Sequence, residues 1–312
     1  MGRRLIEAGR PGSLAPRSDR WQEYLRRLEP TSDGELWAVE DDGVVVRLEG
    51  QALVDGSAGR RSASGSPSSL PDGSLWRVVR GTDGAPMLAA SSGDGAWELQ
   101  DATGLESLLV PGAARYTFGR TADGRTWFGV DHGARGGGLA VHAGDGWTLL
   151  GEQDPERALR VRAMEPDPDG SLWVLGSVGA PGPSTRHVLV RITDDRMEIL
   201  DDAAGMPRSR MQAWTGWSPL QVGALAIDRR GKIWFSIDDV GLWTYDSTGF
   251  RRITRPELRA GALDLETAPD GSIWAVSRHG ALYRLADPVA PQAPSVEPVQ
   301  YDALASTQWR AP

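Results

Sequence analysis

Short runs of alternating apolar and polar residues, each ended by Gly or Asp, recur along the chain and predict β-strands. Residues 222–254 show the pattern clearly, as VGALAID, KIWFSID, GLWTYD and GFRRIT. Each run is rich in Val, Ile, Trp, Phe and Tyr, which favour strands, and its ends carry residues typical of tight turns. This stretch therefore predicts one antiparallel sheet of four strands.

The same unit recurs, because six tryptophans follow a similar turn sequence. The phrases are TSDGELW, LPDGSLW, TADGRTW, DPDGSLW, DRRGKIW and APDGSIW, which end at Trp37, Trp76, Trp127, Trp173, Trp234 and Trp274. Their spacing of 39 to 61 residues fits four short strands per repeat. The sequence therefore predicts an all-β fold, a single β-propeller domain over residues 1–312 built from four-stranded antiparallel blades.

Each phrase has a predicted place in its blade. The Asp-Gly pair supplies the backbone conformation of a two-residue hairpin, so we expect it between the first strand, A, and the second strand, B. The Trp three residues after the Gly is expected to fill the wedge between neighbouring blades. All six tryptophans are therefore interpreted as core residues.

The two ends of the chain bear on the number of blades. Residues 3–25 align with residues 125–150 as strands B, C and D without a strand A, and residues 299–309 could supply that strand. Through the two termini, 75 residues separate Trp274 from Trp37, nearly twice the shortest repeat. Seven blades are favoured, with the ring closed by pairing N- and C-terminal strands. The alternative is six blades, with residues 286–298 as a linker.

Composition excludes several classes of function. The net charge is −8, and no Lys/Arg run alternates with aromatic residues, so no nucleic-acid partner is expected. The chain has no cysteine, which excludes disulfides and thiolate metal sites. No apolar stretch has the length of a membrane span, so no membrane insertion is expected. The compartment stays open: cytoplasmic if residue 1 is the native start, extracytoplasmic if the chain is cut from a longer receptor.

Loop lengths point to one face of the ring. In a propeller the A–B and C–D connections open on one face, and the B–C and blade-to-blade connections open on the other. The longer connections all belong to the second set, at residues 56–69, 131–138, 178–187 and 201–221. Long loops on a rigid scaffold commonly carry binding residues. We call this second face the long-loop face and expect binding there, although loop length alone costs little free energy.

Six residues of these connections are the candidate binding residues. Trp214, Trp217 and Arg210 lie in the longest connection, which has the Trp, Arg and Met mixture enriched at interface hot spots. The alternative for the two tryptophans is burial over the channel mouth. The others are Arg135, His132 and His187, and for the histidines the alternative is a solvated turn position. The expected partner is a protein, a peptide or a small molecule.

Catalytic and metal motifs are not supported. No GxSxG phrase accompanies the four histidines, and no carboxylate pair stands out for acid and base chemistry. The phrase DPDPDG resembles a calcium loop, but the position that needs a bidentate Glu is Val178. We therefore assign no catalytic residue, no metal ligand and no cofactor.

The repeat also resembles known families. The stretches DGSIWAVSRHGALYRL and RGKIWFSIDDVGLWTYD are similar to the two-component-regulator propeller repeats and to streptogramin-lyase-like repeats. The first resemblance implies a sensory domain that binds a ligand or a partner. The second implies a Mg-dependent lyase, whose repeats read Trp-Phe-Thr-Glu after the turn; here only Glu40 keeps the acid.

Our hypothesis from the sequence is a non-enzymatic sensor or interaction propeller that uses the long-loop face. The alternative is a Mg-dependent lyase-like or hydrolytic enzyme with a site at the central channel mouth, using Glu40 or Asp131 with Mg²⁺ or Ca²⁺. A third reading is an architectural subunit of a larger assembly.

Overall fold

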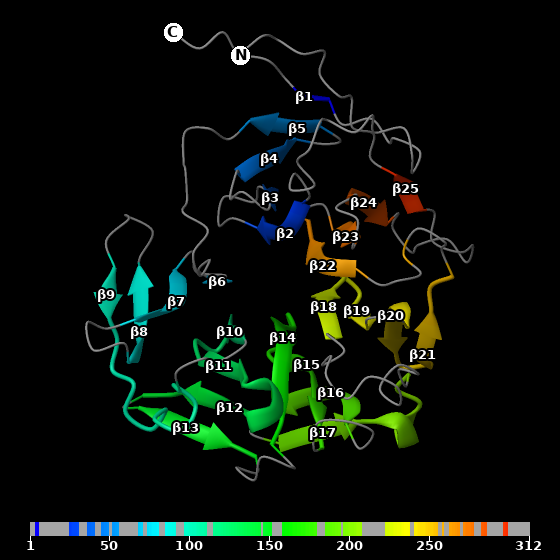
Figure 1. Ribbon diagram of the computed structural model, residues 1–312. Coiled ribbons are helices and arrows are strands. Elements are labelled where there is room, and N and C mark those ends of the chain that lie inside the picture. The colour runs from blue at the N-terminus through cyan, green and yellow to red at the C-terminus, as the bar shows by residue number, and fades with distance from the viewer. Residues whose placement is uncertain are drawn as a thin grey trace, which may run out of the picture.

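The computed structural model shows an all-β chain whose sheets stand around a central axis (Figure 1). For residues before 70 it describes only the backbone. The structure describes residues 4–5, 25–30, 36–40, 45–49, 52–55, 68–70, 74–80, 85–91, 97–110, 115–144, 146–151, 158–179, 185–194, 196–207, 222–237, 240–254, 258, 262–268, 271–277, 282–285 and 296–298.

The described strands form six antiparallel sheets in chain order. The first contains β2 (Leu25–Pro30), β3 (Leu36–Glu40), β4 (Val45–Glu49) and β5 (Ala52–Asp55), with β1 (Arg4–Leu5) added to β5. The second contains β6 (Ser68–Ser69), β7 (Leu75–Arg80), β8 (Pro86–Ser91) and β9 (Glu98–Leu99), and the third β10 (Arg115–Arg120), β11 (Thr126–Asp131), β12 (Gly137–His142) and β13 (Trp147–Leu150).

The second half of the chain repeats the arrangement. The fourth sheet contains β14 (Arg160–Pro166), β15 (Leu172–Val178), β16 (Arg186–Thr193) and β17 (Arg196–Leu200). The fifth contains β18 (Val222–Ile227), β19 (Ile233–Ile237), β20 (Gly241–Asp246) and β21 (Gly249–Arg252), and the sixth β22 (Ala262–Thr267), β23 (Ile273–Ser277), β24 (Leu282–Leu285) and β25 (Val296–Pro298). Two short 3-10 helices, η1 (Gly133–Arg135) and η2 (Asp202–Ala204), lie in connections.

The first strands of the sheets lie toward the axis, and several of them contact the first strand of the next sheet. These contacts join β10 to β14, β14 to β18, β18 to β22, and β22 to β2, which is the arrangement of a propeller (Figure 1). Of the segments proposed for a seventh blade, the structure describes little more than β1, and β1 pairs with β5 at the outer edge of the first sheet instead. The number of blades and the closure of the ring stay predictions.

The turn of the repeat differs from the expected two-residue hairpin. Between β10 and β11, the Gly124 N–H bonds to the Thr121 carbonyl, and the Thr121 N–H bonds to the Arg125 carbonyl, which closes a three-residue loop. Only the Gly takes a positive φ, +86° at Gly124 and +89° at Gly170. The Asp has another role, because the Asp123 carboxylate accepts the Arg125 N–H at 3.1 Å and holds the turn.

The repeat tryptophans fill the wedges between sheets where the structure describes them. Trp127, Trp173, Trp234 and Trp274 are each at most 6% exposed, and the first three pack in clusters drawn from two neighbouring sheets. Trp76 is half-buried and packs on Phe118 of the next sheet. The side chain of Trp37 lies outside the described residues. The interpretation as core is confirmed for the described members.

Each buried indole is anchored to its own turn. The Nε1–H groups of Trp127, Trp173 and Trp234 donate at 3.1 Å to the residue six positions earlier, which is Thr121, Asp167 or Asp228. In the sixth sheet that position is Ala268, which has no acceptor, and Ser272 accepts from Trp274 instead, also at 3.1 Å. An unpaired indole N–H in the core would be costly, so the turn fixes the Trp that holds the wedge.

This anchor gives a stability prediction. Thr121→Val keeps the shape of the side chain but leaves the Trp127 N–H without its acceptor, so we expect urea unfolding to show a loss of about 2 kcal/mol. The matched control is Thr117→Val on β10, whose half-buried hydroxyl has no such role; it should change stability by less than about 0.5 kcal/mol. Equal losses in the two variants would disprove the anchor.

Candidate functional site

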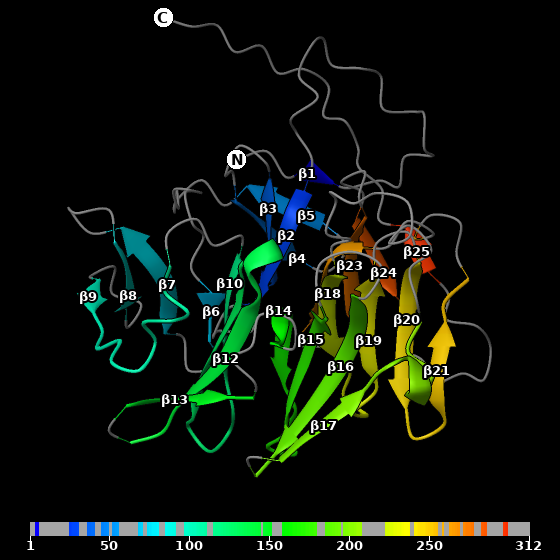
Figure 2. The same ribbon diagram turned by 60° about the horizontal axis from the view of Figure 1, so that its bottom comes forward.

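The strand boundaries place most of the long connections on one face, as expected. The connections 132–136, 151–159, 179–185 and 201–221 are of the B–C or sheet-to-sheet kind, whereas 121–125, 143–146, 167–171 and 194–195 are turns of the other face. Figure 2 shows η1 at one end of the sheets and the β16–β17 hairpin at the opposite end. One connection departs from the pattern: residues 286–295, between β24 and β25, are of the C–D kind.

A cluster of buried polar side chains lies at the long-loop end of the third and fourth sheets. Its members come from the end of β11, the start of β14, the end of β15 and the start of β16, and each is at most 6% exposed. They are Asp131, Arg160, Arg162, Ser177 and His187, which we call the Arg160 cluster. Charged residues are rarely buried to this extent without a specific reason.

Three polar contacts organise the cluster. The Arg162 guanidinium forms an ion pair with the Asp131 carboxylate across the boundary between the two sheets. The second carboxylate oxygen of Asp131 accepts the Gly133 N–H at 2.6 Å. Within the fourth sheet, Arg160 Nε donates to Ser177 Oγ at 3.1 Å. The ion pair therefore fixes β14 against the preceding sheet, and Ser177 fixes the Arg160 side chain.

The backbone around the cluster explains how two arginines come to lie together. Register between β14 and β15 shifts between Val161 and Ala163, so Arg162 lies at a β-bulge, a feature that re-aims side chains. Close approach of neighbouring strands requires glycine. A Cβ on Gly137 would lie 2.7 Å from Arg160 Cα, and one on Gly176 would lie 2.4 Å from the Arg160 carbonyl oxygen.

The cluster holds one positive charge in excess, and its electrostatics disfavour a further one. Burial, with Arg162 and Arg160 nearby, lowers the pKa of His187 to about 4, so its ring is neutral at pH 7. Burial also lowers the pKa of Arg160, Asp131 acts in the opposite direction, and Arg162 lowers it further. Two guanidinium groups thus share one carboxylate.

The structure describes three of the six candidate binding residues, and these three have different environments. Trp214, Trp217 and Arg210 lie outside the described residues. Arg135 is exposed at the end of η1. The half-buried His132 is the N-cap residue of η1, and its backbone N–H donates to the Gly136 carbonyl at 2.8 Å; both residues are on the long-loop face.

His187 was placed wrongly as a loop residue. It lies inside β16, opposite Ser177, and is 4% exposed. Strand β16 begins one residue earlier, at Arg186, because the pairing with β15 already includes Arg186 and His187, before the apolar run starts.

His132 has a perturbed environment as well. Burial lowers the pKa of His132; Asp131 raises it, and Arg135 lowers it. The lowered pKa favours the neutral form of the His132 ring, so His132 adds no positive charge next to the Arg160 cluster at pH 7.

A second electrostatic feature lies on the strands nearest the axis. Burial raises the pKa of Glu165 on β14 to about 8, and Asp264 on β22 adds to this effect. The Glu165 carboxyl therefore holds a proton at neutral pH, and two acids influence each other across the ring.

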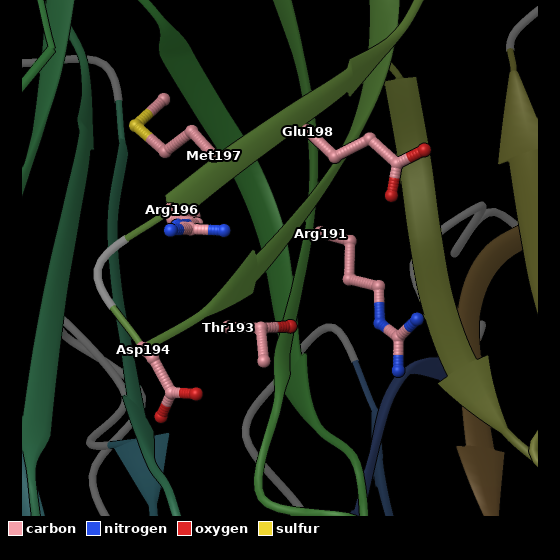
Figure 3. Close-up of a pocket in the computed structure, with 6 residues that line it drawn as sticks. All are labelled: Arg191, Thr193, Asp194, Arg196, Met197 and Glu198. Atoms are coloured by element: carbon pink, nitrogen blue, oxygen red, sulfur yellow. The ribbon is translucent and has the colours of Figure 1, made fainter.

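The described residues also line an open cavity of about 850 Å³ on the opposite face (Figure 3). Its lining is Arg191, Thr193, Asp194, Arg196, Met197 and Glu198, all from the β16–β17 hairpin. Two positive and two negative side chains balance there, and Arg191 is already paired with Asp169 at 2.6 Å. The described lining of this cavity carries no excess charge, in contrast to the Arg160 cluster.

The described residues show neither a metal-binding cluster nor a membrane-spanning helix. No group of three His, Asp or Glu side chains in this part of the chain is arranged to hold a metal ion. Within the same residues, no helix is long and apolar enough to cross a membrane.

Comparisons with known proteins support the fold. No family model and no curated protein matches the sequence. Among solved structures, the extracellular domain of a protein named as the hybrid two component system BT3049 from B. thetaiotaomicron is similar, with 14% identity and a TM-score of 0.54 over 84% of this chain and 39% of that one. The extracellular domain of BT4673, from the same organism and named in the same way, has 12% identity and a TM-score of 0.53 over 87% of this chain and 38% of that one.

These neighbours have propeller folds, in agreement with the resemblance of the repeats to two-component-regulator propellers. At such low identities the likeness concerns the fold alone, and the chain spans less than half the length of either neighbour.

Proposed function

We propose that this propeller is a non-enzymatic recognition domain that binds a ligand or a protein through its long-loop face. The observation that carries the proposal is the Arg160 cluster, which places buried, interacting charges under the face where the longer connections gather. Buried charge costs free energy, and sites of function are where a fold commonly bears such a cost.

The two similar structures support a sensory role. Both are extracellular domains of proteins named as two component systems, and this chain shares their fold over most of its length. A sensor domain needs a rigid frame and one specialised face. The wedge tryptophans supply the frame, and the long-loop face supplies the specialised surface.

The enzymatic alternative loses one of its two acids. Asp131 is occupied by Arg162 and by the Gly133 N–H, so its carboxylate is not free to hold Mg²⁺ or Ca²⁺. The side chain of Glu40 lies outside the described residues. The raised pKa of Glu165 is the one observation that favours acid catalysis near the axis.

A binding screen tests the proposal. The full chain is unfolded thermally with a panel of short peptides, sugars and organic acids, and with MgCl₂ and CaCl₂, because a ligand of the folded state raises the midpoint. We expect at least one organic compound to stabilise the wild type but not the Trp214→Ala/Trp217→Ala variant. Without ligand, that variant should unfold within about 2 °C of the wild type, because the proposal takes both side chains to lie at the surface, where changes cost little.

The control lies on the opposite face. Arg196→Ala/Glu198→Ala removes exposed charges from the cavity in Figure 3 and should leave the response to the compound intact. Loss of the response in this control alone would move the site to the other face. Stabilisation by Mg²⁺ or Ca²⁺ would support the enzymatic alternative, and a collapse of stability in the double Trp variant would show those residues to be core.

A further inference from the structure

The Arg160 cluster contains one buried cationic group whose donors are not all used. Arg160 is 4% exposed, and only its Nε has an acceptor, the Ser177 hydroxyl at 3.1 Å. Its two terminal nitrogens, Nη1 and Nη2, are buried and have no hydrogen-bond partner. A buried donor on a charged group that lacks an acceptor is among the costlier features a fold can hold.

The neighbouring groups do not neutralise Arg160. Asp131 is the one acidic member of the cluster, and it is engaged by Arg162 and the Gly133 N–H. His187 is neutral at pH 7 and brings no negative charge. With two guanidinium groups and one carboxylate, the cluster lacks one negative charge.

The geometry of the unused donors suggests what fits. Nη1 and Nη2 form the planar end of the guanidinium, whose two parallel N–H bonds match the two oxygens of a carboxylate. One carboxylate brings one negative charge, which is the charge the cluster lacks. A phosphate dianion would leave a surplus of negative charge in the same buried volume.

Arg160 is held in place at the end of β14 that lies on the long-loop side. Ser177 holds Nε, and Gly137 and Gly176 allow neighbouring strands to close on the Arg160 backbone. The connections 151–159 and 179–185 run into β14 and out of β15 at this end of the sheets. Both terminal nitrogens are buried, so a ligand carboxylate must displace the groups that cover them before it reaches the guanidinium, whose Nε is already held by Ser177.

We infer that the Arg160 cluster is an anchoring subsite for a single carboxylate group of the ligand, held by the terminal nitrogens of Arg160. The inference rests on the proposed recognition function and adds the chemical class of the ligand. Arg160 would bind the carboxylate, whereas Arg162 and Asp131 would position β14.

The test uses acetate as the probe with the full chain at pH 7. Thermal midpoints are measured at constant ionic strength in acetate, in chloride and in inorganic phosphate, for the wild type and for Arg160→Met. Methionine fills a similar volume without charge, so this variant should fold with equal or greater stability. We expect acetate to raise the wild-type midpoint above that in chloride, and Arg160→Met to weaken acetate binding by about tenfold or more.

A matched control separates the site from general salt effects. Arg186→Met makes the same change at a 54% exposed arginine of β16 and should keep the full acetate response. An acetate response that survives in Arg160→Met would overturn the inference, as would no response in the wild type, which would leave buried water as the partner of Arg160. A phosphate response larger than the acetate response, and dependent on Arg160, would overturn the choice of carboxylate.

The outcome is distinguishable from failure of the proposed function. If acetate has no effect but a screened compound still depends on Trp214 and Trp217, the long-loop face binds and the carboxylate subsite is wrong. If acetate binds through Arg160 while no compound depends on those tryptophans, the subsite is correct and the extended binding surface is wrong.

Discussion

Replacing Asp131 by asparagine will lower the free energy of unfolding by about 4 kcal/mol, because it leaves Arg162 buried without its counter-ion. Asparagine retains an oxygen for the Gly133 N–H, so the loss measures mainly the missing charge. The cluster would then hold two positive charges with no negative one. Urea unfolding followed by circular dichroism measures the change.

Two further variants make this result specific. Adding Arg162→Met to Asp131→Asn removes the stranded cation and should restore at least about half of the lost stability, which a double-mutant cycle reports as coupling. Arg186→Gln breaks the exposed ion pair with Asp201, where the atoms are 3.0 Å apart, and should cost less than about 1 kcal/mol. A small loss in Asp131→Asn would mean that the ion pair does not hold the two sheets together.

Acidification from pH 7 to pH 4 will weaken the fold by about 3 kcal/mol through His187 alone. Burial and the adjacent Arg162 and Arg160 lower the pKa of His187 to about 4, below the value of an unfolded histidine. Between the pKa of the unfolded histidine and that of folded His187, the unfolded chain binds a proton that the folded chain does not bind. This contribution to stability is complete above the unfolded pKa, falls as the pH drops, and levels off near pH 4.

His187→Gln isolates the effect, because glutamine does not titrate. The difference in unfolding free energy between wild type and variant should shift by about 3 kcal/mol in favour of the variant between pH 7 and pH 4. Arg186→Gln, at the neighbouring position of β16, should follow the wild-type profile closely because an arginine stays charged over this range. A constant difference across the range would contradict a neutral buried His187.

The repeat sequence predicted the fold because its signals are local. Gly124 and Gly170 end their turns with a positive φ, and Trp127 and Trp173 lie at the wedge, all within seven-residue phrases. The loop type was predicted less well, since three-residue and two-residue hairpins both accept Asp-Gly. The acceptor six residues before the Trp was missed, although Thr121, Asp167 and Asp228 are visible once the phrases are aligned.

The Arg160 cluster could not be predicted in the same way. Asp131 and Arg162 are 31 positions apart and belong to different sheets, so their contact depends on how the sheets pack. His187 was the one member singled out, and for the wrong reason, as a loop residue. Arg160 and Arg162 alternate with Val161 as solvent-facing residues of a strand would, and they are buried because the register shifts between Val161 and Ala163.

The indole anchor and the Asp131–Arg162 ion pair differ in how they can be inherited. The anchor is complete within seven consecutive residues, so tandem duplication of one segment copies it whole, and Ser272 shows that one copy can change its acceptor and still hold its Trp. The ion pair needs residues from two copies, and among the described residues it is found only at the boundary between the third and fourth sheets. Duplication can thus multiply the scaffold, whereas features particular to one protein must arise afterwards, at the contacts between neighbouring sheets.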